Sequence, residues 1–158
     1  LSSLPLPALL DLLRASEGAL GERANTAFAA RLEHPLDIVL REPEGGGQLR
    51  VLGYNIEEAA AGGQPPALAL YFEVISPLRQ DYAIWMHGVE GETNATFDHN
   101  PRAEASTWDA GAIYVDRTSL AGLPEGAALS FGFWNDASHA RLARENGDTW
   151  IDLGEVTR

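Results

Sequence analysis

Alternating apolar and polar positions predict short β-strands over most of the chain after Pro35. Every second residue is large and apolar in residues 67–75 and again in residues 129–134. Successive side chains of a strand point to opposite faces, so this spacing places one face of each segment in a core. Turn sequences such as those at residues 43–47 and 62–66 separate the segments. The predicted strands are residues 36–41, 48–56, 67–75, 82–89, 112–118, 129–134 and 149–153.

Many short strands with no helical pattern between them are typical of an antiparallel β-sandwich rather than of a parallel α/β sheet. We therefore predict a mainly β fold, Ig-like or jelly-roll-like. It should have at least six antiparallel strands in two packed sheets within residues 36–156. Strand parity predicts a core built from the apolar alternate positions. Its expected members are Leu68, Leu70, Phe72, Val74, Leu129, Phe131 and Phe133.

The first part of the chain has a helical period instead. Apolar residues recur mostly at intervals of three, four and seven between residues 7 and 33, which predicts one face of a helix. Gly18 and Gly21 interrupt the pattern, so two shorter helices fit it as well as one. We predict a helical arm or linker over residues 1–34, which either packs on the sandwich domain of residues 35–158 or connects it to a neighbouring element. The apolar positions are Leu9, Leu10, Leu13, Leu20, Ala24, Phe28 and Leu32.

The composition narrows the classes of function. The chain of 158 residues carries 23 acidic against 11 basic residues, a net charge of −12, and every basic residue is Arg. Binding to nucleic acid or to an anionic membrane surface needs a basic face, so we expect neither as a partner. The absence of Cys excludes disulfides and thiolate chemistry. No apolar run reaches the roughly 18 residues of a membrane span, so this segment is not expected to cross a bilayer.

A series of short motifs follows the predicted strands in order. They are Leu52-Gly-Tyr54, Leu70-Tyr-Phe72, Asp81-Tyr82, His87, Asp98-His-Asn-Pro101, Thr107-Trp108, Gly111, Val115-Asp116, Leu123-Pro-Glu-Gly126, Gly132-Phe-Trp134 and Arg141-Leu142. In this order, over about residues 49–143, the chain resembles a module of some bacterial polytopic membrane glycosyltransferases of the polyprenyl-phosphate-sugar type. That module is the extracytoplasmic β-sandwich at their C-terminus.

The resemblance implies a sandwich fold, a location outside the cytoplasm and an accessory role. The chain departs from the family pattern at Trp85, where Phe is usual, at Ala112, where an acidic residue is usual, and at Trp134, where Tyr is usual. The multi-spanning catalytic portion of those enzymes has no counterpart in this sequence, so no glycosyl-transfer residues can be assigned. Because the chain starts with Leu1 rather than Met, we expect it to be processed or a piece of a longer protein. Any signal peptide or anchor would then lie outside it.

Aromatic side chains on the outward faces of the strands are the first candidate site. If the core positions point inward, alternation turns Tyr71 and Trp134 outward, and Trp85 and His87 share one face. Exposed aromatic rings stack on the apolar faces of sugars and anchor protein interfaces. Two alternatives stay open: the helical arm covers these rings, or a bulge breaks the strand parity. His87 is then a strand histidine that is satisfied by a hydrogen bond.

An acidic loop gives the second candidate. Asp98, Asn100, Glu104 and Asp109 carry the oxygen ligands that Ca²⁺ takes, although their spacing differs from that of an EF-hand loop. The alternative, which we favour, is a solvated turn in which Asp98 and Asn100 cap local backbone N–H groups. Calcium is thus the one cofactor candidate, and otherwise no cofactor is expected.

The sequence contains no recognisable catalytic motif. Ser, His and Asp are present, but none stands in the sequence context of an activated nucleophile. We therefore predict a non-catalytic, extracytoplasmic accessory or binding module of a membrane glycan-handling enzyme, in which exposed aromatics recognise sugar. The alternative is a structural subunit that stabilises a membrane protein complex on its periplasmic side. In both cases the expected partner is a membrane protein or membrane-attached complex, with a glycan as a further candidate ligand.

Overall fold

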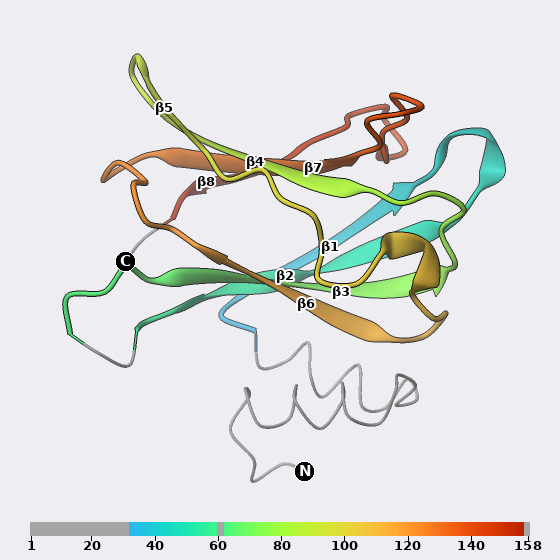
Figure 1. Cartoon of the computed structure of the whole chain (residues 1–158), viewed down its shortest axis with the longest axis horizontal. Helices are drawn as coiled ribbons and strands as arrows, with labels where there is room; N and C mark the ends of the chain where they lie inside the picture. Colours follow the sequence, from blue (N-terminus) through green and yellow to red (C-terminus); the bar gives the residue numbers. More distant parts are fainter. Residues whose placement is uncertain (1–31, 60–61, 157–158) are drawn as a thin grey trace, which may run out of the picture.

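Two four-stranded antiparallel sheets, layered face to face, make up the part of the chain that the computed structural model describes, residues 32–59 and 62–156 (Figure 1). One, here called the β3 sheet, has the spatial order β1-β2-β3-β6, and the other, the β7 sheet, has the order β5-β4-β7-β8. The strands of the β3 sheet are β1 (His34–Arg41), β2 (Gln48–Glu57), β3 (Ala67–Ser76) and β6 (Ile113–Ser119). Those of the β7 sheet are β4 (Ala83–Glu90), β5 (Thr93–Thr96), β7 (Ala128–Trp134) and β8 (Ile151–Glu155). Two short 3₁₀ helices, η1 (Pro43–Gly45) and η2 (Ala105–Thr107), lie in the connections.

The prediction of a mainly β, antiparallel fold is confirmed, and each predicted strand lies within two residues of an observed one. Strand β5 was not predicted, because its four residues are small or polar and mostly exposed and therefore carry no alternation. It pairs with the end of β4 across a tight turn in which Gly91 has a φ of 57°. The predicted helical arm of residues 1–34 lies almost entirely outside the described residues. The Ig-like or jelly-roll-like type stays a prediction.

The core lies between the two sheets, where their apolar alternate positions meet. Phe72 on β3 and Phe133 on β7 face each other across the layers, with ring centroids 5.8 Å apart in an edge-to-face arrangement. Trp108, from the connection between β5 and β6, packs on Phe72 with ring centroids 5.0 Å apart. Burial of this apolar surface is the main force that holds the layers together. All the predicted core residues are buried, namely Leu68, Leu70, Phe72, Val74, Leu129, Phe131 and Phe133.

The outer face of the β3 sheet carries a second apolar cluster. Leu52 on β2, Tyr71 on β3 and Val115 on β6 belong to it, and each is at most 9% exposed. The central strands of this sheet are therefore apolar on both faces, unlike those of an antiparallel sheet with one solvated side. Leu32, the last apolar position of the predicted helical stripe, is buried in the same cluster. The rest of that stripe lies outside the described residues.

A histidine–aspartate pair ties the two sheets together. After β5 the chain runs back along β4, where His99 and Ile84 form a backbone bridge with N···O distances of 2.8 and 2.9 Å. The His99 ring reaches β6 in the other sheet: Nε2 lies 2.8 Å from Asp116 Oδ2, and Nδ1 lies 2.7 Å from the Phe97 carbonyl oxygen. Both partners are acceptors, so a ring protonated on both nitrogens can donate a hydrogen bond to each. The hydrogen bond to Asp116 is the main cause that raises the pKa of His99, and it outweighs burial, which lowers it.

The stability of the fold should depend on pH through this pair. Because folding raises the pKa of His99, the stabilising effect is complete below the pKa of histidine in the unfolded chain, about 6.5, and is lost as the pH rises through the folded-state value. We expect His99→Gln to lower the free energy of unfolding by about 1–3 kcal/mol near pH 6 and by less near pH 9. Urea unfolding over this range tests it, with His139→Gln at an exposed position as control. An equal loss at every pH would contradict the prediction.

Candidate functional site

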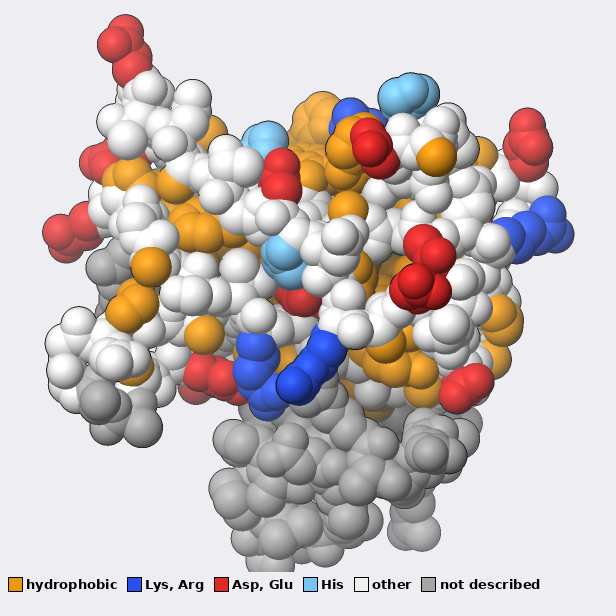
Figure 2. Space-filling view, in the orientation of Figure 1, with side chains coloured by type: hydrophobic (Ala, Val, Ile, Leu, Met, Phe, Trp, Pro, Cys, Tyr) orange, Lys and Arg blue, Asp and Glu red, His pale blue; other side chains and the backbone are white. Residues whose placement is uncertain are grey.

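Three tryptophans gather on the outer face of the β7 sheet around a shallow depression, here called the tryptophan depression. It is open to solvent and has a volume of about 320 Å³. Trp150 is 53% exposed, the highest value among the large apolar side chains of the described residues. In Figure 2 the β7 sheet forms the upper layer, and hydrophobic side chains lie beside His and Arg side chains along that side. The depression is lined by Trp85, His87, Asp98, Trp134, Arg141 and Trp150.

Strand register brings the aromatic side chains to one face. On β4 the residues on either side of Trp85 are buried in the core, so Trp85 and His87 point outward. On β7 the residue before Trp134 is buried, and Trp134 points outward by the same alternation. Because Trp85 pairs with Gly132, Trp85 and Trp134 are two residues, or about 7 Å, apart along the strand direction. Trp150 directly precedes β8, the next strand of the sheet.

Gly132 allows the indole of Trp85 to lie down on the sheet. A Cβ atom at this position would lie 2.6 Å from Nε1 and Cε2 of Trp85 and 2.5 Å from the carbonyl oxygen of Thr149. Any larger residue would therefore push the ring away from β7. Nε1 of Trp85 is buried and has no hydrogen-bond partner within the described residues, so packing rather than a polar contact positions the ring. The remainder of the ring borders the tryptophan depression.

Polar side chains stand at the rim of this aromatic surface. Oδ1 of Asp98 accepts a hydrogen bond from the Met86 backbone N–H at 2.9 Å and lies 3.3 Å from Nε2 of His87. Arg141 pairs through its backbone with Trp134, in a bridge that closes the loop after β7. The site therefore presents an imidazole, a carboxylate and a guanidinium beside aromatic faces.

Three of the four binding residues predicted from the strands meet at this depression. Trp85, His87 and Trp134 share the outer face of the β7 sheet, as strand parity indicated. The prediction that Tyr71 is exposed beside Trp134 is wrong, because Tyr71 lies on the other sheet and is 1% exposed. Its direction was predicted correctly, since it points away from the core that contains Phe72. The error arose because the outer face of the β3 sheet is itself apolar and buried.

Two residues of the depression were missed in the sequence. Trp150 lies in the predicted strand of residues 149–153, and the buried Ile151 beside it shows that strand parity turns Trp150 outward. Applying the same argument to this strand would have found it. Arg141 reaches the site because the loop after β7 turns back on itself, with the Asn135 N–H bonded to the Ala140 carbonyl oxygen at 2.8 Å. No local sequence pattern indicates that return.

The acidic residues suggested as calcium ligands lie at different places in the fold, and calcium binding stays a prediction. Asp98 lines the tryptophan depression, whereas Glu104 and Asp109 lie on either side of η2. Within residues 32–59 and 62–156, no three His, Cys, Asp or Glu side chains form a group that could hold a metal ion. Asp98 does bind a backbone N–H group, but that of Met86 on β4 rather than one of its own loop. Asn100 makes no side-chain hydrogen bond with the described residues.

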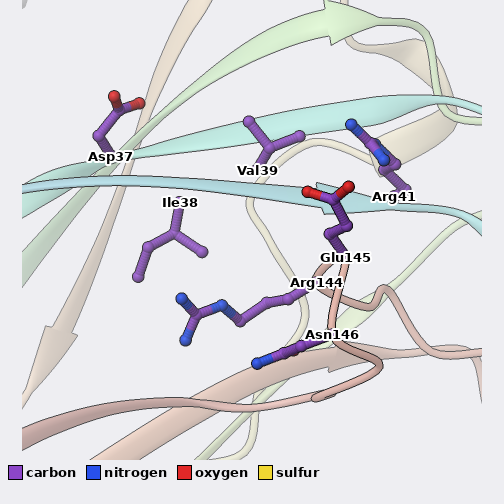
Figure 3. Close-up of a pocket in the computed structure, with 7 residues that line it drawn as sticks. All are labelled: Asp37, Ile38, Val39, Arg41, Arg144, Glu145 and Asn146. Carbon is purple, nitrogen blue, oxygen red and sulfur yellow. The ribbon is translucent and has the colours of Figure 1, made fainter.

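A second depression lies beside strand β1. In Figure 3 the side chain of Arg144 extends toward Ile38, and Arg41 and Glu145 lie at the other end. The depression mixes acidic and basic groups and has no aromatic ring, so it lacks the stacking surface that the tryptophan depression offers. It is lined by Asp37, Ile38, Val39, Arg41, Arg144, Glu145 and Asn146.

Comparisons with known proteins do not identify a function for this chain, so the function has to be inferred from the geometry of the site. No family model, curated protein or solved structure matches this chain. The resemblance to the glycosyltransferase module therefore stays a prediction. Among the described residues, no helix has the length and apolar character needed to cross a membrane.

Proposed function

We propose that this protein is a non-catalytic glycan-binding module and that the tryptophan depression is its sugar site. The observation that carries the proposal is the convergence of Trp85, Trp134 and Trp150 on one solvent-facing side of a sheet. Aromatic side chains combine a large apolar surface with a fixed ring geometry, which suits stacking on the apolar face of a sugar ring. Covering such a surface with a ligand is favourable because it removes apolar area from water.

The groups at the rim provide hydrogen bonds for sugar hydroxyls. A hydroxyl both donates and accepts, so it can bind the carboxylate of Asp98, the ring of His87 and the guanidinium of Arg141. An apolar surface with a few convergent polar groups is the usual composition of a ligand site. The volume of about 320 Å³ lies at the small end for such sites and suits a few sugar units.

The shape of the depression supports binding rather than catalysis. It is open, so a glycan chain can lie across it without being enclosed. Asp98 is the single carboxylate that lines it among the described residues, and this carboxylate already contacts the Met86 N–H and His87. Glycoside hydrolysis generally uses a pair of carboxyl groups on either side of the bond that breaks.

The proposal extends to location: the module works outside the cytoplasm, next to a membrane-bound enzyme that handles glycans. This part rests on the resemblance of residues 49–143 to the glycosyltransferase module. A binding module in that place would hold a glycan near the enzyme and raise its effective concentration there. The net charge of −12 favours a partner surface that is neutral or basic, since like charges across an interface are costly.

Removing one tryptophan of the depression should weaken sugar binding without affecting the fold. We expect Trp134→Ala and Trp150→Ala each to raise the dissociation constant about tenfold or more, since covering one large apolar side chain contributes about 1.5–3 kcal/mol. Screening on an array of neutral and acidic oligosaccharides identifies a ligand, and calorimetry with that ligand measures the change. Val89→Ala is the matched control, because Val89 also points outward from β4 and is 45% exposed, but lies outside the depression.

The melting temperature of each variant distinguishes a loss of sugar binding from a loss of folding. Lost sugar binding with an unchanged melting temperature supports the glycan-binding module. Failure of every oligosaccharide to bind the native chain overturns the proposal and leaves the structural subunit as the remaining prediction.

A further inference from the structure

We infer that the tryptophan depression selects acidic sugars, with Arg141 binding the carboxylate of a uronic acid. This inference rests on the proposed sugar site and names the class of sugar that the site takes. It comes from Arg141, a charged group of the depression that has no side-chain partner within the described residues.

The fold places Arg141 beside the aromatic rings. The loop after β7 returns antiparallel to the end of that strand, so that Arg141 forms a backbone bridge with Trp134. The next residue, Leu142, donates its N–H to the Phe133 carbonyl oxygen at 3.2 Å and is fully buried in the core. Because neighbouring side chains of an extended segment point to opposite faces, Arg141 points outward, to the side of Trp134.

The charges in the depression leave Arg141 available for a ligand. Asp98 is the carboxylate that could neutralise it, but Asp98 already accepts the Met86 N–H at 2.9 Å and lies 3.3 Å from His87. Within the described part of the chain, Arg141 takes part in no ion pair and in no side-chain hydrogen bond. Its guanidinium therefore keeps five N–H donors in a fork that matches a carboxylate.

The negative charges around Arg141 favour a ligand with one carboxylate over a highly charged polyanion. Asp98 lines the same depression, and the chain as a whole carries −12 charges, so a highly charged ligand would be repelled. At physiological salt the Debye length is about 8 Å, so distant charges are screened while a direct Arg–carboxylate contact persists. A uronic acid combines one carboxylate with a ring that can stack on Trp134.

Uronic acids compared with their methyl esters test the inference, because esterification removes the negative charge and keeps the sugar ring. The probes are the methyl glycosides of galacturonate, glucuronate and mannuronate, each with one carboxylate and each measured against its methyl ester by calorimetry. We expect the native chain to bind at least one acid about tenfold or more tightly than its ester, because a charge-assisted hydrogen bond replaces a neutral one. Arg141→Gln should reduce the ratio of the two affinities to about one, and Arg141→Lys should keep part of it. Arg102→Gln, at an exposed arginine outside the depression, should leave the ratio unchanged.

The outcomes separate this inference from the proposed function. If neutral sugars and esters bind through Trp134 but no acid is preferred, the inference fails and the glycan-binding module stands. If Arg141→Gln still prefers the acid over its ester, another group binds the carboxylate, and the proposed role of Arg141 is wrong. If no sugar of either kind binds, the proposed function fails, and the inference fails with it.

Discussion

Replacing Phe72 with alanine should lower the free energy of unfolding by about 3–5 kcal/mol, the loss typical of a large buried aromatic. Phe72 is 1% exposed and lies where the two sheets meet. Its ring contacts Trp108, Tyr114 and Phe133, at centroid distances of 5.0, 6.3 and 5.8 Å. Truncation would remove these contacts and leave a cavity that the surrounding strands cannot fill, because both sheets are fixed by their hydrogen-bond ladders.

Chemical unfolding followed by tryptophan fluorescence measures this loss. Ile75→Ala is the matched control, since Ile75 lies on the same strand, points to the other face and is 36% exposed. We expect the control to change the free energy of unfolding by less than about 1 kcal/mol. Equal losses at both positions would show that the inward face of β3 has been assigned wrongly.

The strands were predictable because each carries its own signal. In β3 and β7 the alternation of large apolar residues with smaller or polar ones fixes which face is buried, and it does so within a single segment. The β1–β2 hairpin was predictable from its glycine-rich turn for the same reason. Strand β5 could not be found, because it is a short, exposed edge strand whose pairing depends on β4 rather than on its own sequence.

The candidate site was only partly predictable. Strand parity shows to which face of the sheet a side chain points, but not whether that face is exposed. It correctly turned Trp85 and Trp134 away from the core, and the sheet topology then placed them together. The same argument failed for Tyr71, which points outward but belongs to a second buried apolar cluster. Asp98 was noticed only as a calcium candidate or a turn cap, because its partner His87 is distant in sequence and lies beside it only through the fold.

The burial of Glu42 could not be predicted from the sequence. It is one of 23 acidic residues, and no local pattern distinguishes it, yet its exposed fraction in the fold is only 5%. Its Oε1 accepts the backbone N–H groups of Gly47 at 2.6 Å and Arg79 at 2.8 Å. Its Oε2 accepts the Gln80 N–H at 3.3 Å and the Tyr82 hydroxyl at 2.8 Å. The carboxylate thus joins the β1–β2 turn to the segment between β3 and β4.

Tyr82 and Gly47 are adapted to this buried carboxylate. Burial, together with the hydrogen bond to Glu42, raises the pKa of Tyr82, so its hydroxyl keeps its proton and donates. A Cβ at Gly47 would lie 2.2 Å from the Pro77 carbonyl oxygen, so only glycine brings its N–H this close to the carboxylate. Burying a charge is unfavourable unless hydrogen bonds satisfy it, and here four donors do so.

Removing the carboxylate should therefore destabilise the fold far more than an ordinary glutamate substitution. We expect Glu42→Ala to lower the free energy of unfolding by about 3–5 kcal/mol, because each buried donor left unsatisfied costs about 1–3 kcal/mol and water can reach some of them. Glu42→Gln should cost less, about 1–2 kcal/mol, since its amide oxygen can replace Oε1 and the Tyr82 hydroxyl can rotate to accept from its amide nitrogen.

Urea unfolding at neutral pH distinguishes these variants, with Glu125→Ala, at an exposed glutamate, as the control. The control should change the free energy of unfolding by less than about 0.5 kcal/mol. The order of the losses is the decisive result, because general loss of negative charge from a chain of net charge −12 would stabilise all three variants alike. If Glu42→Ala were as stable as Glu125→Ala, the two segments would be held together by apolar packing alone, and the four hydrogen bonds of Glu42 would contribute no net stability.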